Sequence, residues 1–409
     1  MSAIITRTQW AAENLPAGLT MSSGGIITGK PTVEGSYDVP VTVNTNWGTA
    51  TKNIHISVEK QIKWTARGII NYNNNARLYS KGYIDIIDNL PLFAAIDVNS
   101  NLYFNYVYRI DTDEKDDDSI IVSPIKSAGI ATTANNYYSN VYGFVKCKYY
   151  SDRIYILGSK SHSNRYIHYL TESSTFPGSD GSISSSTISS SIASSITPRA
   201  GCIDNNWDVL IFFSSKVIKI PYNSTSLDTT AYSVGVIPNY RCAACNTQSG
   251  VICVTSSNGI RVTTGYGNTW VSATTSPNDN LLELTYREDL NKFFAVGEST
   301  GLFYVSEDGL NWEQFNNTPV PLTTVKSMSY NASAGYCVIG TAADGTDKHT
   351  YHSMDGENWT EAILPFNDNA YTVISVAYSP NFECFFIKAS YTRHLYTLSK
   401  TDLWGNQDS

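Results

Sequence analysis

Ser306-Glu-Asp-Gly-Leu-Asn-Trp312 and Ser353-Met-Asp-Gly-Glu-Asn-Trp359 are near copies of one heptapeptide, and this repetition decides the fold. Thr264-Gly-Tyr-Gly-Asn-Thr-Trp270 is a degenerate third copy without the aspartate, and residues 399–404 form a worn fourth copy that is one residue shorter. The motif tryptophans are 42, 47 and 45 residues apart, at positions Trp270, Trp312, Trp359 and Trp404. A motif that returns at nearly constant spacing indicates a repeat architecture.

The segments that precede each motif have the composition of strands. Leu284-Thr-Tyr286 leads into Phe293-Phe-Ala-Val-Gly297, and in the next repeat Met328-Ser-Tyr330 leads into Tyr336-Cys-Val-Ile-Gly340. These runs are short, rich in aromatic and β-branched residues, and have no helical period. Four short strands in roughly 45 residues is the size of a β-propeller blade. We therefore predict an all-β protein in which residues 61–409 form a propeller.

The predicted number of four-stranded blades is about seven. Three repeats before the motif-bearing ones are less regular, and we place them near residues 90–125, 142–178 and 200–234. Residues 62–88 fit two interpretations, a strand that closes the ring or a worn additional blade. Six and eight blades therefore stay as alternatives.

The Ser-x-Asp-Gly-x-x-Trp pattern resembles the Asp-box, or BNR repeat, of sialidase-like propellers. Its serine ends a strand, and the aspartate carboxylate can accept backbone N–H bonds in the following turn. The glycine permits the positive φ of that turn, and the tryptophan fills space between adjacent blades. In that family the box lies away from the binding face, so the resemblance implies a structural role. The structural residues are Ser306, Asp308, Gly309, Trp312, Ser353, Asp355, Gly356 and Trp359.

Residues 1–60 have a different pattern, in which alternating apolar residues at 39–43 and 54–58 predict two strands. Asn44-Thr-Asn-Trp-Gly48 between them has the composition of a hairpin turn. Leu15-Pro-Ala-Gly-Leu19 and Gly25-Ile-Ile-Thr-Gly-Lys-Pro31 complete a pattern that resembles the Ig-like domains of bacterial surface proteins and phage tail proteins. The resemblance implies a small β-sandwich that serves as a spacer or docking unit and has a thin core.

Composition excludes several classes of partner. The 28 Lys and Arg residues are outnumbered by 36 Asp and Glu, which gives a net charge of −8 and no basic stripe for nucleic acid. No apolar run approaches the ~20 residues that span a bilayer, so we predict no membrane insertion. The seven cysteines are scattered, and the N-terminus lacks a signal-peptide pattern. These features favour reduced cysteines and folding in a reducing cytosol.

The sequence predicts no catalytic residues and no cofactor. A sialidase would need an arginine cluster for the substrate carboxylate, and the Arg-Ile-Pro motif that usually accompanies its first member is missing. A sialidase-like glycoside hydrolase therefore stays only as an alternative, based on fold analogy.

Two groups of residues are weak candidates for metal sites. Asp111, Asp113, Asp116 and Asp118 offer oxygen ligands for Ca²⁺, but Lys115 interrupts them and no glycine follows. A solvated loop is the preferred interpretation. Cys242 and Cys245 are three apart, as are His349 and His352, so each pair would point to opposite faces of a strand. We predict no metal site from these pairs and interpret the cysteines as core residues.

Two further segments could face a ligand. The serine-rich stretch 179–197 is either a loop between blades or an arm that orders against a partner. Tyrosines are dense between residues 137 and 169, and exposed rings suit sugar stacking or protein interfaces, although ordinary strand-surface tyrosine is the default. The candidate ligand-facing rings are Tyr137, Tyr138, Tyr149 and Tyr150.

These features together suggest a phage virion protein that is made in the host cytoplasm and acts outside it. In this hypothesis the Ig-like module docks on other virion proteins within a symmetric assembly, and propeller loops bind a host-surface glycan. The alternatives are a glycoside hydrolase and a purely structural capsid or tail decoration.

Overall fold

The structure is a computed structural model of the 409-residue chain. It consists of two compact units, residues 1–61 and residues 62–409, which are described separately. The residues that the structure describes are 9–29, 31, 33, 35–58, 62–69, 81–87, 90–96, 102–110, 120–124, 138–146, 153–160, 166–171, 182–187, 199–213, 216–221, 231–233, 240–256, 259–264, 269–365, 372–390 and 394–399.

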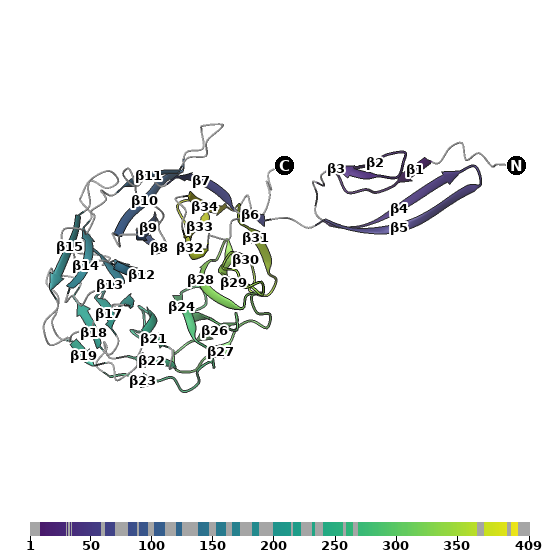
Figure 1. The fold of residues 1–409 in the computed structure, drawn as a ribbon. Coiled ribbons are helices and arrows are strands. Elements are labelled where there is room, and N and C mark those ends of the chain that lie inside the picture. Colours follow the sequence, from purple (N-terminus) through teal and green to yellow (C-terminus); the bar gives the residue numbers. More distant parts are fainter. Residues whose placement is uncertain are drawn as a thin grey trace. The chain divides into compact units, whose positions relative to one another are not determined.

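The N-terminal unit is a three-stranded antiparallel sheet with a short separate hairpin (Figure 1). The sheet has the order β1 (Gln9–Ala12), β4 (Gly35–Thr45), β5 (Gly48–Val58), and the hairpin consists of β2 (Leu19–Met21) and β3 (Ile27–Gly29). Val39 pairs with Ile54, which places the alternating apolar residues of both strands on one face as predicted. The two-residue turn Asn46-Trp47 joins β4 to β5.

One face of this sheet is polar, and the core on its other face is thin. Thr42 Oγ1 lies 2.9 Å from Thr51 Oγ1, and His55 Nδ1 lies 2.9 Å from Asp38 Oδ1 on the polar face. On the apolar face Val39 is fully buried, whereas Trp47 at the hairpin tip is 76% exposed. A unit of this size can bury only a limited apolar area.

The described residues of the second unit form seven sheets around a centre, and their strands are antiparallel except for one parallel pair in the sixth sheet (Figure 1). The first two sheets are β8 (Lys81–Ile87), β9 (Leu90–Ile96), β10 (Leu102–Ile110), β11 (Ile120–Pro124), and β12 (Tyr138–Lys146), β13 (Arg153–Lys160), β14 (Tyr166–Thr171), β15 (Ser182–Thr187). The third and fourth are β16 (Ala200–Ile203), β17 (Val209–Phe213), β18 (Lys216–Ile220), β19 (Ala231–Ser233), and β20 (Tyr240–Cys245), β21 (Ile252–Ser256), β22 (Gly259–Thr263), β23 (Val271–Ser272).

The last three sheets contain the motif copies. The fifth and sixth are β24 (Leu281–Arg287), β25 (Lys292–Gly297), β26 (Phe303–Ser306), β27 (Glu313–Gln314), and β28 (Thr324–Asn331), β29 (Gly335–Thr341), β30 (His349–Ser353), β31 (Thr360–Ile363), β6 (Ile62–Lys63). The seventh is β32 (Val373–Ser379), β33 (Cys384–Ala389), β34 (His394–Ser399), β7 (Thr65–Ile69). The prediction of an all-β propeller with about seven blades is confirmed.

The ring closes through a segment that precedes the first blade in the sequence. β7 is the outermost strand of the seventh sheet, and β6 pairs in parallel with β31 of the sixth. Residues 62–69 are therefore a closing segment that spans two blades, and 81–87 form the innermost strand of the first blade. The closing-strand interpretation is therefore confirmed for residues 62–69. The alternative of a worn additional blade is wrong for the described residues, because 81–87 belong to the first blade.

The hydrophobic core lies between blades rather than within them. The cluster around Tyr155 and Ile211 joins blades 2 and 3, and the cluster around Phe212 and Val254 joins blades 3 and 4. Further clusters join each successive pair up to blades 6 and 7. Because a blade cannot bury both faces alone, each blade depends on its neighbours for stability.

The two intact motif turns have the same hydrogen bonds. Asp308 Oδ1 accepts the backbone N–H groups of Leu310 and Asn311, each at 2.8 Å, and Ser306 Oγ accepts Gly309 N at 2.8 Å. In the second turn Asp355 Oδ1 accepts Glu357 N and Asn358 N, also at 2.8 Å. These bonds lower the pKa of Asp355. Burial raises the pKa of Asp308, but the hydrogen bonds outweigh this effect, and the pKa of Asp308 is also lowered.

Each of the three described motif tryptophans packs against the preceding blade. Trp270 of blade 4 lies edge-on to Phe212 of blade 3, with ring centroids 5.8 Å apart. Trp359 of blade 6 lies edge-on to Phe303 of blade 5 at 5.6 Å. Trp312 joins the cluster between blades 4 and 5. Each tryptophan therefore ties its blade to the preceding one, while Trp404 lies outside the described residues.

The six described cysteines are free thiols. Burial raises the pKa of Cys242 to about 11 and of Cys245 to about 12, and it also raises the pKa of Cys202, Cys253 and Cys337. Because the thiolate is the reactive form, native thiols should be unreactive.

We predict that a Cys147→Ser variant reacts with Ellman's reagent only at the rate at which the propeller unfolds. Cys147 lies outside the described residues, and replacing it restricts the assay to the six described thiols. Unfolding in denaturant should expose all six thiols to the reagent at the same time. A stoichiometric fast reaction of the folded variant would contradict the prediction.

Lys388 is a buried lysine in the second strand of blade 7. Its side chain is 1% exposed, and its Nζ donates to the carbonyl oxygen of Ala389 at 2.7 Å. Burial lowers the pKa of Lys388 from 10.5 to about 8. The alternate residues Cys384 and Phe386 share its strand face, and Phe386 lies edge-on to Phe93 of blade 1 at 6.4 Å. Lys388 is therefore on the face of blade 7 that is turned toward blade 1.

Lys388 predicts a pH dependence with a definite sign. Between a folded pKa of about 8 and an unfolded pKa of 10.5, the unfolded chain binds more protons, so stability rises with pH in this window. We expect the unfolding free energy of the wild type, relative to Lys388→Met, to rise by about 1.4 kcal/mol per pH unit. Denaturant titrations of both proteins across the window measure this difference, which excludes other ionising groups because both proteins share them. A constant difference would contradict the prediction.

Among the described residues, no helix is long and apolar enough to cross a lipid bilayer.

Candidate functional site

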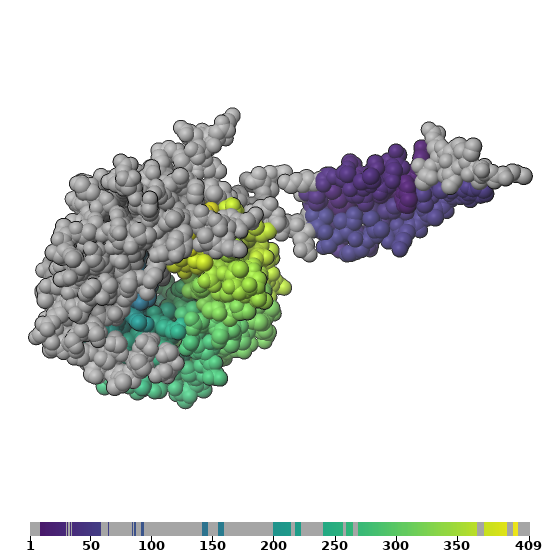
Figure 2. Space-filling view, viewed as in Figure 1, coloured from purple at the N-terminus to yellow at the C-terminus, as the bar shows by residue number. Residues whose placement is uncertain are grey.

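A pocket of about 500 Å³ lies where the innermost strands of blades 5 and 6 approach those of blades 1 and 7. β24 and β28 supply most of its lining, β8 contributes Ile84 and Ile86, and β32 contributes Val376 and Ala377. In the space-filling view, the described residues of blades 4–6 form one continuous surface (Figure 2). The pocket therefore depends on ring closure, because its walls come from both ends of the propeller sequence.

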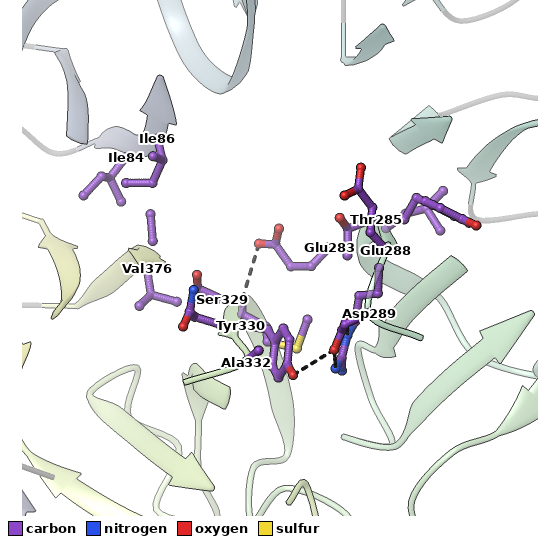
Figure 3. Close-up of a pocket in the computed structure, with 16 residues that line it drawn as sticks. Ile84, Ile86, Glu283, Thr285, Glu288, Asp289, Ser329, Tyr330, Ala332 and Val376 are labelled. Carbon is purple, nitrogen blue, oxygen red and sulfur yellow. Dashed lines mark hydrogen bonds and ion pairs between the residues drawn. The ribbon is translucent and has the colours of Figure 1, made fainter. Parts of the chain in front are cut away.

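The two sides of the pocket differ in chemistry. Ile84, Ile86 and Val376 lie on one side, and Thr285 and Glu288 lie on the other (Figure 3). An apolar wall that faces a wall with oxygen atoms suits a ligand that has one apolar and one polar face.

Arg287 is held entirely by protein groups at the end of the pocket. Its Nη2 and Nε contact the Asp289 carboxylate at 2.5 and 3.1 Å, and its Nη1 donates to Tyr336 Oη at 2.5 Å. The guanidinium carbon lies 3.5 Å from the centroid of the Tyr330 ring, a stacked cation–π contact. The arginine side chain is 6% exposed. Arg287 therefore shapes the pocket wall rather than offering a charge to a ligand.

The same cluster fixes the ionisation of its members. Hydrogen bonding to Arg287 lowers the pKa of Asp289, so this carboxyl group is ionised at neutral pH. Burial raises the pKa of Tyr330 to about 12, and its hydroxyl donates to Asp289 Oδ2 at 3.2 Å. Tyr330 therefore stays protonated and acts as a hydrogen-bond donor.

Glu283 has an unusual backbone conformation for a residue in an inner strand. Its φ is +51°, and it lies at a bulge in β24 where the register with β25 shifts between Leu282 and Thr285. Its Oε1 accepts a hydrogen bond from Met328 N at 3.4 Å, so the side chain crosses from blade 5 toward blade 6 (Figure 3). The bulge re-aims this carboxylate into the pocket.

The pocket lies at the end of the propeller that also carries the motif turns. Successive strands of a blade are antiparallel, so the turn after the first strand and the turn after the third lie at the same end. The pocket includes residues of the first-strand turns, such as Glu288 and Ala332. The resemblance to sialidase-like propellers placed the binding face at the opposite end, so this pocket departs from that expectation.

The other sequence-predicted site residues are not joined to the pocket. Tyr137, Tyr149 and Tyr150 lie outside the described residues, and Tyr138 begins β12. The calcium candidates Asp111, Asp113, Asp116 and Asp118 also lie outside them. In the described part of the chain, no group of three His, Cys, Asp or Glu residues is arranged to hold a metal ion.

The two histidines of the His349-x-x-His352 pair have separate surroundings. His352 is buried, and its Nε2 lies 2.6 Å from the carbonyl oxygen of Ala334. His349 lies between two carboxylates, with Nε2 3.0 Å from Asp344 Oδ2 and Nδ1 2.7 Å from Glu361 Oε1. These ion pairs outweigh desolvation and raise the pKa of His349. Both ring nitrogens of His349 are therefore engaged by protein groups.

Sequence reasoning missed the pocket residues although it used their strands to define the repeats. In the sequence, Leu284–Tyr286 and Met328–Tyr330 were interpreted only as strands that precede the next strand of each repeat. The available signal was the charged run Arg287-Glu-Asp289 directly after an aromatic residue, which differs from the equivalent turns of other blades. Its partners on β8 and β32 are distant in the sequence, so the pocket itself could not be predicted.

Comparison with known proteins supports both units of the fold. Residues 4–59 match the family described as "Putative Ig domain". No curated protein matches the chain. The chain is therefore an Ig-like domain followed by a β-propeller.

Solved structures similar to this chain are β-propeller proteins of diverse kinds. A catalytically inactive virginiamycin B lyase from Staphylococcus aureus, solved with quinupristin, has a TM-score of 0.55 and 12% identity over 82% of this chain and 99% of its own. YCF48 bound to D1 peptide has a TM-score of 0.50 and 15% identity, over 82% and 95% of the two chains. Raptor from Chaetomium thermophilum has a TM-score of 0.52 and 11% identity, over 82% of this chain and 29% of its own. At these identities the likeness shows the fold alone.

Proposed function

We propose that this chain is a non-enzymatic attachment protein of a phage particle, in which the propeller binds a host-surface glycan at the pocket between β24 and β28. The Ig-like domain docks on other virion proteins in a symmetric assembly. The protein is made in the host cytoplasm and acts outside the cell as part of the virion.

The observation that carries the glycan proposal is the two-sided lining of the pocket. A pyranose ring has an apolar C–H face and a rim of hydroxyl groups. Ile84, Ile86 and Val376 match the apolar face, and Glu283 and Thr285 supply oxygen atoms for the hydroxyls. These groups lie on three inner strands, β8, β24 and β32, which give them a rigid frame.

Two features support binding rather than sialidase chemistry. Sialidases grip a substrate carboxylate with several arginines, whereas the arginine in this pocket is occupied by Asp289 and Tyr336. The exposed carboxylate of Glu288 in the pocket lining would repel an acidic sugar.

The virion assignment draws on the domain combination and the cysteines. An Ig-like domain of a type common in phage tail proteins precedes a propeller, and the described cysteines are free thiols, as expected of a protein folded in a reducing cytosol. Mass spectrometry of purified particles tests this assignment. We expect the chain in intact particles and its loss from them when residues 1–61 are deleted, whereas a free cytosolic monomer would contradict the assignment.

A pocket-filling variant tests glycan binding. Thr285 is exposed and lines the pocket, so Thr285→Trp should fill it without disturbing the core. Thr360→Trp is the matched control, because Thr360 is an exposed strand threonine in β31 and does not line the pocket. We expect the wild type and the control to bind a host-envelope glycan fraction and Thr285→Trp to bind at least about tenfold more weakly.

Three outcomes would contradict this proposal. Equal binding by both variants would place the binding surface elsewhere, and absence of binding to every envelope fraction would favour a structural decoration. Release of free sugar from the bound fraction would favour the glycoside hydrolase alternative.

A further inference from the structure

We infer that Ser36, His55 and Asp38 form a serine hydrolase triad on the Ig-like unit, which hydrolyses small carboxylic esters. This inference goes beyond the proposed attachment function. Attachment through the propeller pocket is non-enzymatic, whereas this reaction takes place within residues 1–61.

The imidazole of His55 connects the other two side chains. Its Nε2 lies 2.9 Å from Ser36 Oγ, and its Nδ1 lies 2.9 Å from Asp38 Oδ1. A carboxylate that accepts Nδ1–H fixes the tautomer in which Nε2 carries no proton and accepts the serine hydroxyl. The three groups are therefore arranged as nucleophile, general base and positioning carboxylate.

The pairing of β4 with β5 explains why these side chains meet. His55 is directly opposite Asp38, and Ser57 is directly opposite Ser36. Ser36 and Asp38 are two residues apart on β4, so both project from the polar face of the sheet. A long side chain reaches both the opposite and the diagonal position of a neighbouring strand. The His55 ring therefore bridges two positions of β4 through its two nitrogens.

The backbone N–H of Ser36 supplies a donor for the oxyanion. Thr45 forms a hydrogen-bonded pair across the two-residue turn, and such pairs alternate along the ladder. Even-numbered residues of β4 therefore direct their N–H and C=O groups away from β5, as Pro40 does when its carbonyl oxygen accepts Glu13 N at 3.1 Å. In the described part of the chain β1 ends opposite Val41, so the Ser36 N–H lies beyond it and can donate to an oxyanion.

The reaction that these groups support is acyl transfer to water. Ser36 Oγ attacks the ester carbonyl carbon while its proton passes to His55 Nε2, and the carbonyl oxygen becomes an oxyanion. The intermediate then collapses, the bond to the alcohol oxygen breaks, and the alcohol leaves with the proton from His55. Water repeats both steps on the acyl-serine, so one ester and one water give one acid and one alcohol.

The exposure of the triad determines its substrate class and its rate. The side chains of His55 and Asp38 are 62% and 78% exposed, and Ser36 is also exposed. The substrate therefore approaches from solvent, and an accessible ester with a small acyl group, such as an acetyl ester, fits this face. Water weakens electrostatic stabilisation of the oxyanion. General-base catalysis remains, and we expect a rate enhancement near the lower end of its usual range of about 10²–10⁴-fold.

Site-resolved labelling of the full chain with a fluorophosphonate tests the nucleophile. Ser36 Oγ forms the bond to phosphorus, fluoride leaves, and His55 takes the proton. Ser57 is the internal control, because it is an exposed serine on the same face, directly opposite Ser36. We expect mass spectrometry of the digested protein to show labelling at Ser36 at least about a hundredfold faster than at Ser57. Equal rates at the two serines would overturn the inference.

Variants of the triad separate catalysis from structure. His55→Ala and Asp38→Asn should each slow the labelling of Ser36 at least about tenfold, while their urea midpoints stay at the wild-type value because these side chains are exposed. Imidazole added to the buffer should restore part of the labelling in His55→Ala. Ser57→Ala is the matched control and should label at Ser36 like the wild type. Undiminished labelling of Ser36 in His55→Ala would show that this base does not activate the serine, and the inference would be wrong.

Hydrolysis of p-nitrophenyl acetate by the full chain tests turnover. We expect the wild type and Ser57→Ala to release p-nitrophenolate over many turnovers, and Ser36→Ala to be at least about tenfold slower, with no rescue by imidazole beyond the rate of imidazole alone. Labelling of Ser36 without this difference in turnover would show a reactive serine that is not a hydrolase, which also overturns the inference. These measurements do not involve the propeller pocket, so the glycan proposal is decided separately by Thr285→Trp.

Discussion

Trp64→Ala is expected to lower the unfolding free energy of the propeller by about 3–5 kcal/mol, the usual cost of deleting a buried tryptophan. Trp64 is 2% exposed and belongs to the cluster that joins blades 6 and 7. Its Nε1 donates to Thr350 Oγ1 at 2.8 Å, and its backbone N–H donates to the carbonyl oxygen of Ile363 at 2.9 Å. The residue lies between β6 and β7, so its loss weakens the closing segment on both blades at once.

Urea unfolding of the full chain, followed by circular dichroism, measures this effect. Trp47→Ala is the matched control, since Trp47 is 76% exposed at the hairpin tip of the Ig-like domain. Its replacement should change stability by less than about 0.5 kcal/mol. Similar losses for the two variants would show that Trp64 does not close the ring.

Gly309→Ala is expected to destabilise the propeller by about 2–5 kcal/mol through two separate effects. The φ of Gly309 is +74°, which disfavours any residue with a Cβ atom. A Cβ placed there would also lie 2.1 Å from Cys253 Sγ, in the core of the preceding blade. The motif turn of blade 5 therefore fits directly against blade 4.

Two control variants separate these effects. Gly345 has nearly the same φ, +75°, and a Cβ added to it would meet no atom within 4 Å, so Gly345→Ala should cost only about 1 kcal/mol. In a Cys253→Ala background, Gly309→Ala should cost about as little, because the clashing sulfur is gone. Equal costs for Gly309→Ala in both backgrounds would show that the turn does not depend on the neighbouring blade.

The repeated heptapeptide was sufficient to predict the local structure of the turns. The hydrogen bonds of Asp308 and Asp355, and the positive φ of Gly309 and Gly356, involve residues within a few positions of one another. Such interactions are encoded by adjacent residue types and therefore appear directly in the sequence. The regular spacing of these turns also predicted the propeller.

The candidate site could not be predicted in the same way. Glu283 and Thr285 were visible only as part of a strand, and the bulge that gives Glu283 its φ of +51° has no clear local signal. The opposing wall, Ile84 and Val376, comes from the first and last blades. The charge of a residue in the sequence also does not predict whether that charge can bind a ligand. Arg287 could bind an anion as far as the sequence shows, but in the structure its guanidinium group binds Asp289 and Tyr336.

The sequence by itself determined the all-β class, the Ig-like domain and the repeat of the propeller, because strand patterns and turn motifs depend on near neighbours. Only the tertiary structure decided that residues 62–69 close the ring across two blades and that four inner strands form the pocket. Ring closure is a long-range contact between segments about 300 residues apart, and its register depends on how seven blades pack around a centre. The heptapeptide that fixed the fold lies at the same end of the propeller as the pocket, but the pocket's chemistry comes from the inner strands.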